Sequence, residues 1–297
     1  MALAYACAVR LSARPTASAP PSWKPSTPRS SPGIPEPDDR ETPHTNDRRA
    51  RVDRETAARS IHVALGLPHD GDDSDDTLLD ESAFLVSYNA RLHDPNWVAW
   101  HLEASDLGHA HRHDSFRPDD ALPDDVYRVS PHDYARTSYD RGHLCPFADR
   151  NGTTESARRT FLMTNMEPQL HELNAGPWEK LEQSERAWAI EPEAALFIVA
   201  GGVFDENPTR IGHDVAVPRA TYKIVVVLRR GQGAKDVTLA TRTVAVEMPN
   251  EPGVGRRPWR EFVTTIDRIE ADTGYDFLSS IPEPVQSALE AGTARDP

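Results

Sequence analysis

The chain has 297 residues, enough for one large domain or two ordinary ones, and its hydrophobic share of 38% suffices for a sizeable core. Its 47 acidic and 33 basic side chains give a net charge of −14 at pH 7, which argues against a broadly basic nucleic-acid-binding surface, because phosphate affinity comes chiefly from Lys and Arg. The only two cysteines, Cys7 and Cys145, exclude a disulfide framework, and no apolar run approaches the ~20 residues that span a bilayer.

The first part of the chain predicts a tail. Residues 1–55 are rich in Pro, Ser, Ala and Arg and cannot bury enough apolar surface to order themselves, so we expect the folded domain over residues 56–297. The first acidic residue is Glu36, which gives the tail a targeting character. A secretory signal would use the apolar run of residues 3–9, which is short and ends at Arg10; a transit peptide or a plain disordered tail fits equally well.

Two strands are predicted next, over residues 84–88 and 96–102, from their aromatic and β-branched content. The intervening Asp94-Pro95-Asn96 predicts a turn and hence a hairpin.

A polar loop then carries His109, His111 and His113. On an extended segment, alternate side chains share a face, so these three imidazoles are candidates to bind one metal ion. The alternative is a solvated histidine-rich loop.

The stretch from Thr137 to Ile190 concentrates the chemically useful residues. A strand and turn are expected to present Asp140-Arg141-Gly142-His143, and residues 160–165 predict a buried strand that ends at Asn165. Asn174-Ala175-Gly176-Pro177 predicts a helix start, since a proline costs little in the first turn. On that helix Trp178, Glu182 and Arg186 lie four residues apart on one face. Trp178 and Trp188 are expected in the core, with base stacking as the alternative.

Further strands are predicted over residues 195–202 and 222–228, with a half-exposed strand over residues 237–247. A helix is predicted from Pro258 through Ile269 to Thr273-Gly274. One α+β domain with a central antiparallel sheet flanked by helices fits this order best.

Four motifs occur in order: D-R-G-H at 140–143, T-N-x-x-P-Q at 164–169, N-x-G-x-W at 174–178 and L-E-x-x-E-R at 181–186. In residues and spacing they resemble the DNA/RNA non-specific endonucleases, the ββα-metal nucleases that include secreted sugar-non-specific bacterial nucleases and endonuclease G. The resemblance covers about residues 61–289 and implies a ββα-metal finger active site.

The resemblance also implies roles. His143 is expected to be the general base, a task that a neutral imidazole can perform near physiological pH. Asn174 matches the asparagine that holds a hydrated Mg²⁺, with Mn²⁺ as a substitute, and Glu182 would accept hydrogen bonds from the water molecules on that ion.

Three arginines are expected to grip phosphate through paired N–H donors: Arg112, Arg141 and Arg186. The alternative for Arg186 is an ordinary surface pair with Glu182. Asn165 is expected to orient the loop or His143, or to contact substrate; the alternative is a buried asparagine that satisfies backbone groups.

The expected activity is Mg²⁺-dependent endonucleolytic hydrolysis of DNA and RNA with little sequence preference, because nothing recognisably reads base edges. Alternatives are a degenerate relative that binds nucleic acid or protein without cutting, and a metal-binding module at the three histidines. Secretion or a periplasmic location is favoured by the resemblance, with organelle targeting as the alternative. An inhibitor protein is a further expected partner, and the sequence leaves a homodimer open.

Overall fold

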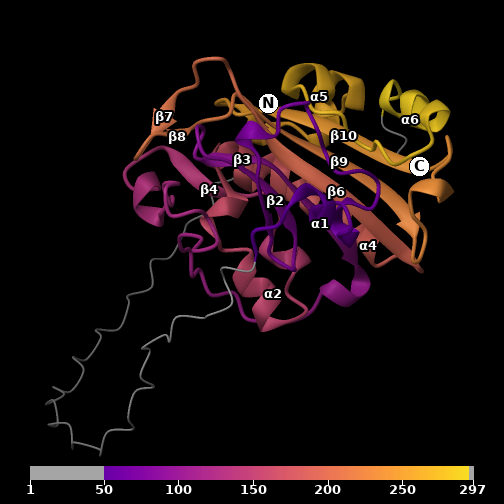
Figure 1. Cartoon of the computed structure of the whole chain (residues 1–297), viewed down its shortest axis with the longest axis horizontal. Helices are drawn as coiled ribbons and strands as arrows, with labels where there is room; N and C mark the ends of the chain where they lie inside the picture. The colour runs from indigo at the N-terminus through magenta and orange to yellow at the C-terminus, as the bar shows by residue number, and fades with distance from the viewer. Residues whose placement is uncertain (1–49, 294–297) are drawn as a thin grey trace, which may run out of the picture. The chain divides into compact units, whose positions relative to one another are not determined.

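The computed structural model describes residues 50–293, which are built around a six-stranded antiparallel sheet (Figure 1). Its strand order is β1-β2-β3-β6-β9-β10. The strands are β1 (Thr77–Asp80), β2 (Leu85–Asn89), β3 (Asp94–Glu103), β6 (Ala194–Val203), β9 (Ala220–Arg229) and β10 (Arg242–Pro249). The predicted α+β class and central antiparallel sheet are confirmed.

The hairpin between β2 and β3 turns earlier than predicted. Asp94 already pairs with Asn89 in the sheet, so Asp94-Pro95-Asn96 is not the turn. The Asn89 side-chain oxygen accepts hydrogen bonds from the backbone N–H groups of Arg91 (2.9 Å) and Leu92 (3.1 Å), and this local bond closes the turn. Pro95 is tolerated in β3 because the register shifts there, at an irregularity between Ser87 and Tyr88.

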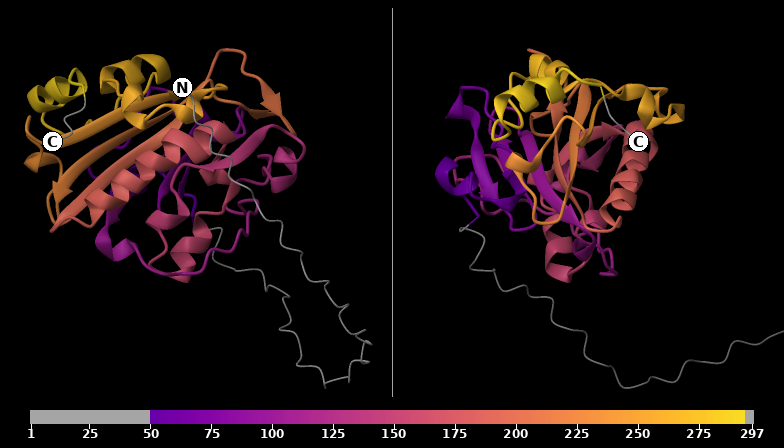
Figure 2. Two further views of the ribbon diagram at one scale, coloured as in Figure 1. Left: turned by 180° about the vertical axis from the view of Figure 1, so that it is seen from behind. Right: turned by 90° about the vertical axis from the view of Figure 1, so that its right-hand side faces the viewer.

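Helices cover both faces of the sheet (Figure 2). On one face α4 (Glu179–Ala189) packs Leu181 and Trp188 into a core that also holds Trp100 of β3. On the other face, α5 (Ile266–Thr273) and α6 (Glu283–Glu290) contribute Ile269 and Leu289 to a second core. The central strands bury side chains on both faces, which explains their nearly continuous apolar sequences.

A second hairpin carries the D-R-G-H motif. Strand β4 (Tyr139–His143) pairs antiparallel with β5 (Met166–Leu170), and α2 (Thr154–Arg159) lies in the connection between them. Residues 160–165 were predicted to be a strand, and that prediction is wrong. They form turns, the last a 3-10 helix over Met163–Asn165, because a short buried apolar run does not by itself fix an extended backbone.

The helical segment after β5 begins before the predicted position. It comprises α3 (His171–Leu173), a π-helical turn over Asn174–Trp178, and then α4. Gly176 has φ −108° and ψ −117°, which interrupts the helix, and Pro177 follows the break. The proline is therefore accommodated at a kink, where no regular backbone hydrogen bond is lost.

Two other predicted segments are shorter or broken. The strand expected over residues 237–247 begins only at Arg242, as β10, after a turn closed by Thr238 and Thr241. The helix expected from Pro258 is divided into a 3-10 helix (Trp259–Phe262) and α5, which starts after the Thr265 cap. Gly274 ends α5 with φ 84°, as predicted. A small hairpin of β7 (Arg210–Ile211) and β8 (Val215–Ala216) lies apart from the main sheet.

The fold includes residues that we expected in the tail. Ala50 is buried, Arg51 bridges to Leu79, and Val52 donates to Leu78 before α1 (Arg54–Ala57) begins. The predictions for residues 1–49, including Cys7 and the targeting segment, lie outside the described residues. Within residues 50–293, no helix has the length and apolar character to cross a membrane.

Candidate active site

The D-R-G-H hairpin fixes His143 at the end of β4. His143 lies opposite Met166 in the hairpin, and its backbone oxygen accepts a hydrogen bond from Trp178 Nε1 at 3.1 Å. A Cβ at Gly142 would meet the Gln169 side-chain oxygen at 2.3 Å, so a larger residue there would displace the buried Gln169 side chain. The bond from Trp178 attaches β4 to the helical segment that follows β5, and this is the ββα arrangement expected from the sequence.

The His143 imidazole lies in an aromatic environment. Its ring centroid is 5.2 Å from that of Phe161, edge to face, and 5.6 Å from that of Phe116. His143 is only 9% exposed, and its Nε2 is buried without a hydrogen-bond partner. The pKa of His143 is lowered to about 3, chiefly by burial; nearby Arg112 and Arg141 contribute to the fall and Asp114 opposes it. The imidazole is therefore neutral at neutral pH and has a nitrogen available to accept a proton.

Two of the three predicted arginines lie beside this imidazole. The Arg112 guanidinium is 5.3 Å from the centroid of the Phe161 ring, and that of Arg141 is 4.3 Å from the centroid of Phe116. Arg112 also pairs with Asp114 at 2.8 Å, on the exposed side of the loop. The aromatic rings thus hold both cations around His143, where an anion would meet them together.

Arg186 is placed differently from its predicted role. Its Nη1 lies 3.0 Å from Asp149 Oδ1, and the same atom is 3.9 Å from Glu182 Oε2. Asp149 is fully buried, and its other oxygen accepts from Trp100 Nε1 at 3.0 Å. The Arg186 charge is consequently engaged by a buried carboxylate, which favours a structural role over gripping phosphate.

Asn174 faces the same strand as the candidate base. Its Nδ2 donates to Asp140 Oδ2 at 3.0 Å, and Asp140 Oδ2 also lies 2.8 Å from His171 Nδ1. Asp140 is the first residue of the D-R-G-H motif and His143 is the last, so Asn174 and Trp178 are attached to the two ends of one short strand. This bond directs the amide nitrogen of Asn174 to Asp140 and leaves its oxygen, a hard donor, for another partner.

Glu182 lies one helical turn after Trp178 and is largely buried. Burial raises the pKa of Glu182 to about 8; the Lys223 ammonium opposes this rise, and Asp149 and Glu185 add to it. A carboxylate with such a pKa is one that a cation or a cluster of ordered water molecules would stabilise in its charged form.

Asn165 is fully buried and cannot contact substrate. Its Oδ1 accepts from Cys145 N at 2.9 Å, and its Nδ2 donates to the backbone oxygens of Cys145 (2.8 Å) and Thr160 (2.9 Å). These bonds hold the chain two residues after His143. Of the roles that the sequence left open, the geometry supports the orienting and backbone-satisfying ones.

Burial also decides the roles open to Trp178, Trp188 and Cys145. Trp178 and Trp188 are buried in the core, so neither is available to stack on a base. Burial raises the pKa of Cys145 far above its ordinary value, which makes the thiol unsuited to act as a nucleophile.

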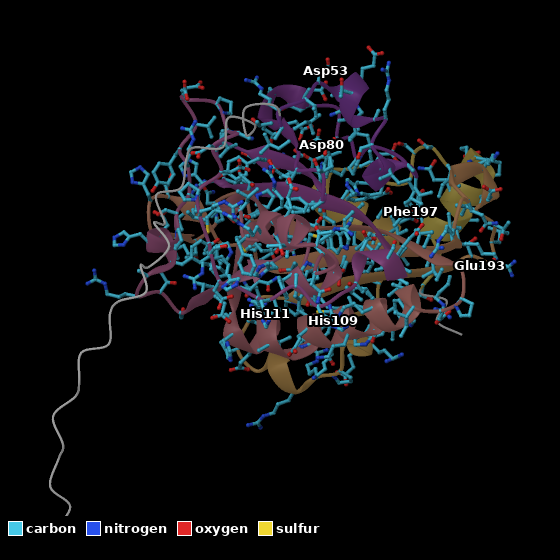
Figure 3. All side chains as sticks on the ribbon, turned by 90° about the horizontal axis from the view of Figure 1, so that it is seen from below. Asp53, Asp80, His109, His111, Glu193 and Phe197 are labelled. Carbon is cyan, nitrogen blue, oxygen red and sulfur yellow. The ribbon has the colours of Figure 1, made fainter. Side chains whose placement is uncertain are left out.

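The histidine loop does not form a metal site. His109, His111 and His113 are exposed, and His109 and His111 are labelled in Figure 3. Across residues 50–293, only one group of three His, Cys, Asp or Glu side chains brings its donor atoms within 4.8 Å of one another, and it contains none of these histidines. The exposed loop matches the solvated alternative.

Sequence reasoning missed a buried ion pair under the site. Lys223 Nζ lies 3.3 Å from Glu185 Oε2, both side chains are fully buried, and the ammonium is 4.1 Å from the centroid of Trp178. Burial raises the pKa of Glu185 to about 7, although Lys223 opposes the rise. The sequence did carry a signal for this pair: Lys223 is a single lysine within the apolar run of residues 222–228, and a buried strand tolerates a lysine only with a counter-charge.

Comparisons with known proteins agree with this geometry. The family model described as DNA/RNA non-specific endonuclease matches residues 65–283. A nuclease of Nostoc sp. is 41% identical over 237 residues, which is 78% of this chain and 85% of that protein. The mitochondrial nuclease EXOG of Danio rerio is 30% identical over 250 residues, covering 77% of this chain and 68% of that protein.

The structural comparison supports the same architecture. This chain aligns with a chain in the crystal structure of the EndoG/EndoGI complex with a TM-score of 0.63. The alignment covers 75% of this chain and 92% of that chain at 24% identity, so the likeness is one of fold.

Proposed function

Since the chain belongs to the DNA/RNA non-specific endonuclease family and is therefore a metal-dependent nuclease, we propose that His143 is its general base and that Asn174 holds its divalent cation. The observation that carries this assignment is the environment of His143. A neutral imidazole lies near two arginines whose charges act on it, on a strand whose other end is bonded to Asn174.

His143 takes a proton from a water molecule onto an imidazole nitrogen as that water attacks phosphorus. The low pKa of the free site would make this a weak base. A phosphate bound beside Arg112 and Arg141 brings negative charge that offsets the field of the two guanidinium groups, so substrate binding raises the pKa of His143. The base thereby gains strength when the scissile group is in place.

The donor set at Asn174 fits a hard cation. The available atom is an amide oxygen, the neighbouring Asp140 is a carboxylate, and Glu182 lies on the following helix with a pKa that a nearby positive charge would lower. A bound Mg²⁺ supplies neutralisation of the charge that grows on the phosphate and on the leaving 3′ oxygen. Glu182 would accept hydrogen bonds from water molecules around such an ion and so orient them.

Arg112 and Arg141 bind the phosphate, while Arg186 and Asn165 position the framework. Arg186 is committed to Asp149, and Asn165 fixes the turn that follows His143. Recognition centred on phosphate, without side chains that read base edges, accounts for weak sequence preference and for action on both DNA and RNA.

Several further assignments belong to this proposal. We assign Mg²⁺ as the resident ion and Mn²⁺ as a substitute. An inhibitor protein is proposed by analogy with the EndoG/EndoGI complex, and a homodimer is left open. A secreted or periplasmic location is proposed, with an organelle as the alternative, since the matching nucleases include a bacterial protein and mitochondrial ones.

The proposal is tested with supercoiled plasmid DNA and a structured RNA, each incubated with Mg²⁺, Mn²⁺ or EDTA. Conversion of the plasmid to nicked circles identifies internal cleavage. His143→Ala is expected to lower the cleavage rate by roughly 10²–10⁴-fold, and Asn174→Ala to raise the Mg²⁺ concentration needed for half-maximal rate. His109→Ala, which removes an exposed histidine, is the matched control and keeps full activity.

All variants are purified identically, and their thermal unfolding is compared with that of the wild type so that loss of activity is separated from loss of folding. Full activity in folded His143→Ala would exclude this base. Tight binding of DNA without cleavage in any of the metals would instead support the alternative of a degenerate, binding-only relative.

A further inference from the structure

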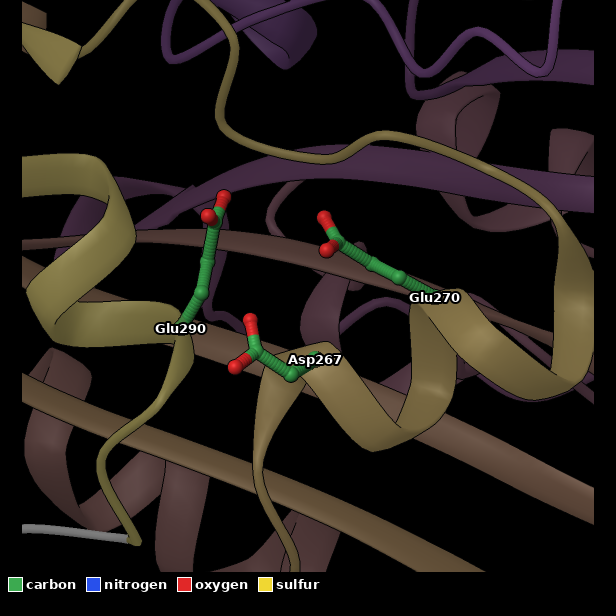
Figure 4. Close-up of side chains that lie close together, drawn as sticks. All are labelled: Asp267, Glu270 and Glu290. Carbon is green, nitrogen blue, oxygen red and sulfur yellow. The ribbon is translucent and has the colours of Figure 1, made fainter.

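A second group of acidic side chains lies on the sheet face opposite α4. Asp267 and Glu270 come from α5, and Glu290 is the last residue of α6 (Figure 4). Each offers one carboxylate oxygen, and the three oxygens lie within 4.8 Å of one another. Glu270 is also tied to the backbone, because its Oε1 accepts from Phe277 N at 2.9 Å. Two consecutive helices thus bring three carboxylates together.

Glu290 distinguishes this group from an ordinary acidic surface. It is only 6% exposed, and its Oε1 is buried without a hydrogen-bond partner. Figure 4 shows its carboxylate in the same neighbourhood as those of Asp267 and Glu270. A buried carboxylate oxygen without a partner costs free energy, so its persistence here points to a ligand that the oxygen would meet.

The charges around the group are of one sign. Burial raises the pKa of Glu290 to about 7; the Gln286 amide opposes the rise, and Glu270, Asp276 and Asp267 add to it. Burial, the largest cause, also raises the pKa of Glu270. Within residues 50–293, no lysine or arginine forms an ion pair with Asp267, Glu270 or Glu290. The group therefore lacks a described counter-charge.

We propose that Asp267, Glu270 and Glu290 bind a Ca²⁺ ion that joins α5 to α6, separate from the active site. Oxygens at about 2.4 Å from one Ca²⁺ lie at most about 4.8 Å apart, and these three atoms lie within that distance of one another. The donors are all carboxylate oxygens, and the exposed side of Asp267 leaves room for water molecules to complete the shell. Mg²⁺ fits less well because it demands a near-ideal octahedron at about 2.0–2.1 Å.

The ion has a structural consequence. Ile269 of α5 and Leu289 of α6 belong to one apolar core, and mutual repulsion of the three carboxylates opposes their packing. Ca²⁺ removes that repulsion and so stabilises the C-terminal part of the fold. With only three protein ligands, of which one is exposed, a Kd of about 10⁻⁴–10⁻³ M is expected, as in extracellular calcium modules.

The test uses the full chain carrying Asn174→Ala, so that the proposed catalytic cation position does not contribute. Ca²⁺ is titrated by calorimetry, and thermal unfolding is followed in Ca²⁺, Mg²⁺ or EDTA. One Ca²⁺ per chain is expected, and at ten times the Kd the unfolding midpoint should rise by roughly 3–6 °C. Mg²⁺ at the same concentration should raise it less.

Glu290→Gln should abolish both the heat of binding and the rise in midpoint, and in EDTA it should unfold at a higher temperature than its parent because repulsion is relieved. Asp267→Asn, at an exposed position, supplies a second variant if Glu290→Gln does not fold. Glu283→Gln, which removes one charge from α6 outside the group, should bind Ca²⁺ as its parent does.

Absence of Ca²⁺ binding in the parent, or binding retained in Asp267→Asn and Glu290→Gln, would overturn the proposal. Arg295 lies outside the described residues, so Arg295→Ala is included. If this variant binds Ca²⁺ and its parent does not, the guanidinium is the counter-charge and the proposal fails. None of these outcomes depends on nuclease activity.

Discussion

Asn165 offers a sharp test of how the site is held. In Asn165→Ala, three backbone groups lose their partners: the N–H and C=O of Cys145 and the C=O of Thr160. All three bonds lie in the buried interior, so water cannot replace the amide without rearrangement. The bond from Leu144 N to the Asn165 backbone oxygen remains, because the substitution does not change the main chain.

The expected cost follows from these contacts. Leaving one buried polar group unsatisfied costs about 1–3 kcal/mol, so the loss of three bonds should lower the free energy of unfolding by at least ~3 kcal/mol. For a domain of this size, that corresponds to a fall in Tm of roughly 6–12 °C. Activity should also fall by at least about tenfold, because the displaced turn starts two residues after His143 and small misplacements of a catalytic group are costly.

Urea unfolding gives the free energy, and plasmid nicking at 20 °C, where the variant remains folded, gives the rate. Asn151→Ala is the matched control: its side-chain oxygen accepts one bond, from Gly108 N at 2.7 Å, in a partly buried position. It should cost about 1 kcal/mol and leave the rate unchanged. An Asn165→Ala chain within 1 kcal/mol of wild type, with the wild-type rate, would refute this reasoning.

Three further predictions concern the helix behind His143. Lys223→Met should destabilise the fold by about 3–5 kcal/mol in urea unfolding, because it leaves the Glu185 carboxylate buried without its counter-charge. Adding Glu185→Gln to this variant should recover part of the loss, and equal stabilities for the single and double variants would contradict the prediction. Trp178→Phe removes the Nε1–H bond to the His143 backbone and should lower the nicking rate more than the Tm, and a rate equal to wild type would show that the bond does not position the base. Burial raises the folded pKa of Glu182 from 4.5 to about 8, so between these pH values the folded chain holds a proton that the unfolded chain releases. The free energy of unfolding in EDTA should therefore fall as pH rises from 4.5 to 8, by up to about 1.4 kcal/mol per pH unit from this group. Urea unfolding of Glu182→Gln should show a shallower fall with pH, and an unchanged slope would argue against the raised pKa.

The sequence predicted the active-site hairpin well because the signals there are local. Gly142 leaves room for the Gln169 side chain, and the motif residues around it are separated by short, fixed distances along β4, β5 and the helix. Short-range spacing is retained in any fold that keeps the hairpin and helix together. His143, Asn174 and Glu182 were therefore singled out as candidates from the sequence, and the structure places all three in one ββα unit.

Predictions failed where competing local signals had similar strength. Asp94-Pro95-Asn96 contains typical turn residues, but Asn89 closes the turn through its side chain, and the sheet register then places Asp94 in β3. Residues 160–165 are apolar enough for a strand, but they are buried as turns against the hairpin. Neither outcome can be read from composition, because burial and backbone conformation are decided together by the packing of distant segments.

The sequence by itself determined the family motifs, the α+β class, most strands and the residues around the candidate base. Only the tertiary structure decided which charges meet: Arg186 with Asp149, Lys223 with Glu185, and Asp267 of α5 with Glu290 of α6. The members of these pairs lie 23 to 38 positions apart along the chain. Their proximity depends on how the sheet and helices pack, whereas the strength of each interaction depends on burial, and the linear order of residues specifies neither directly.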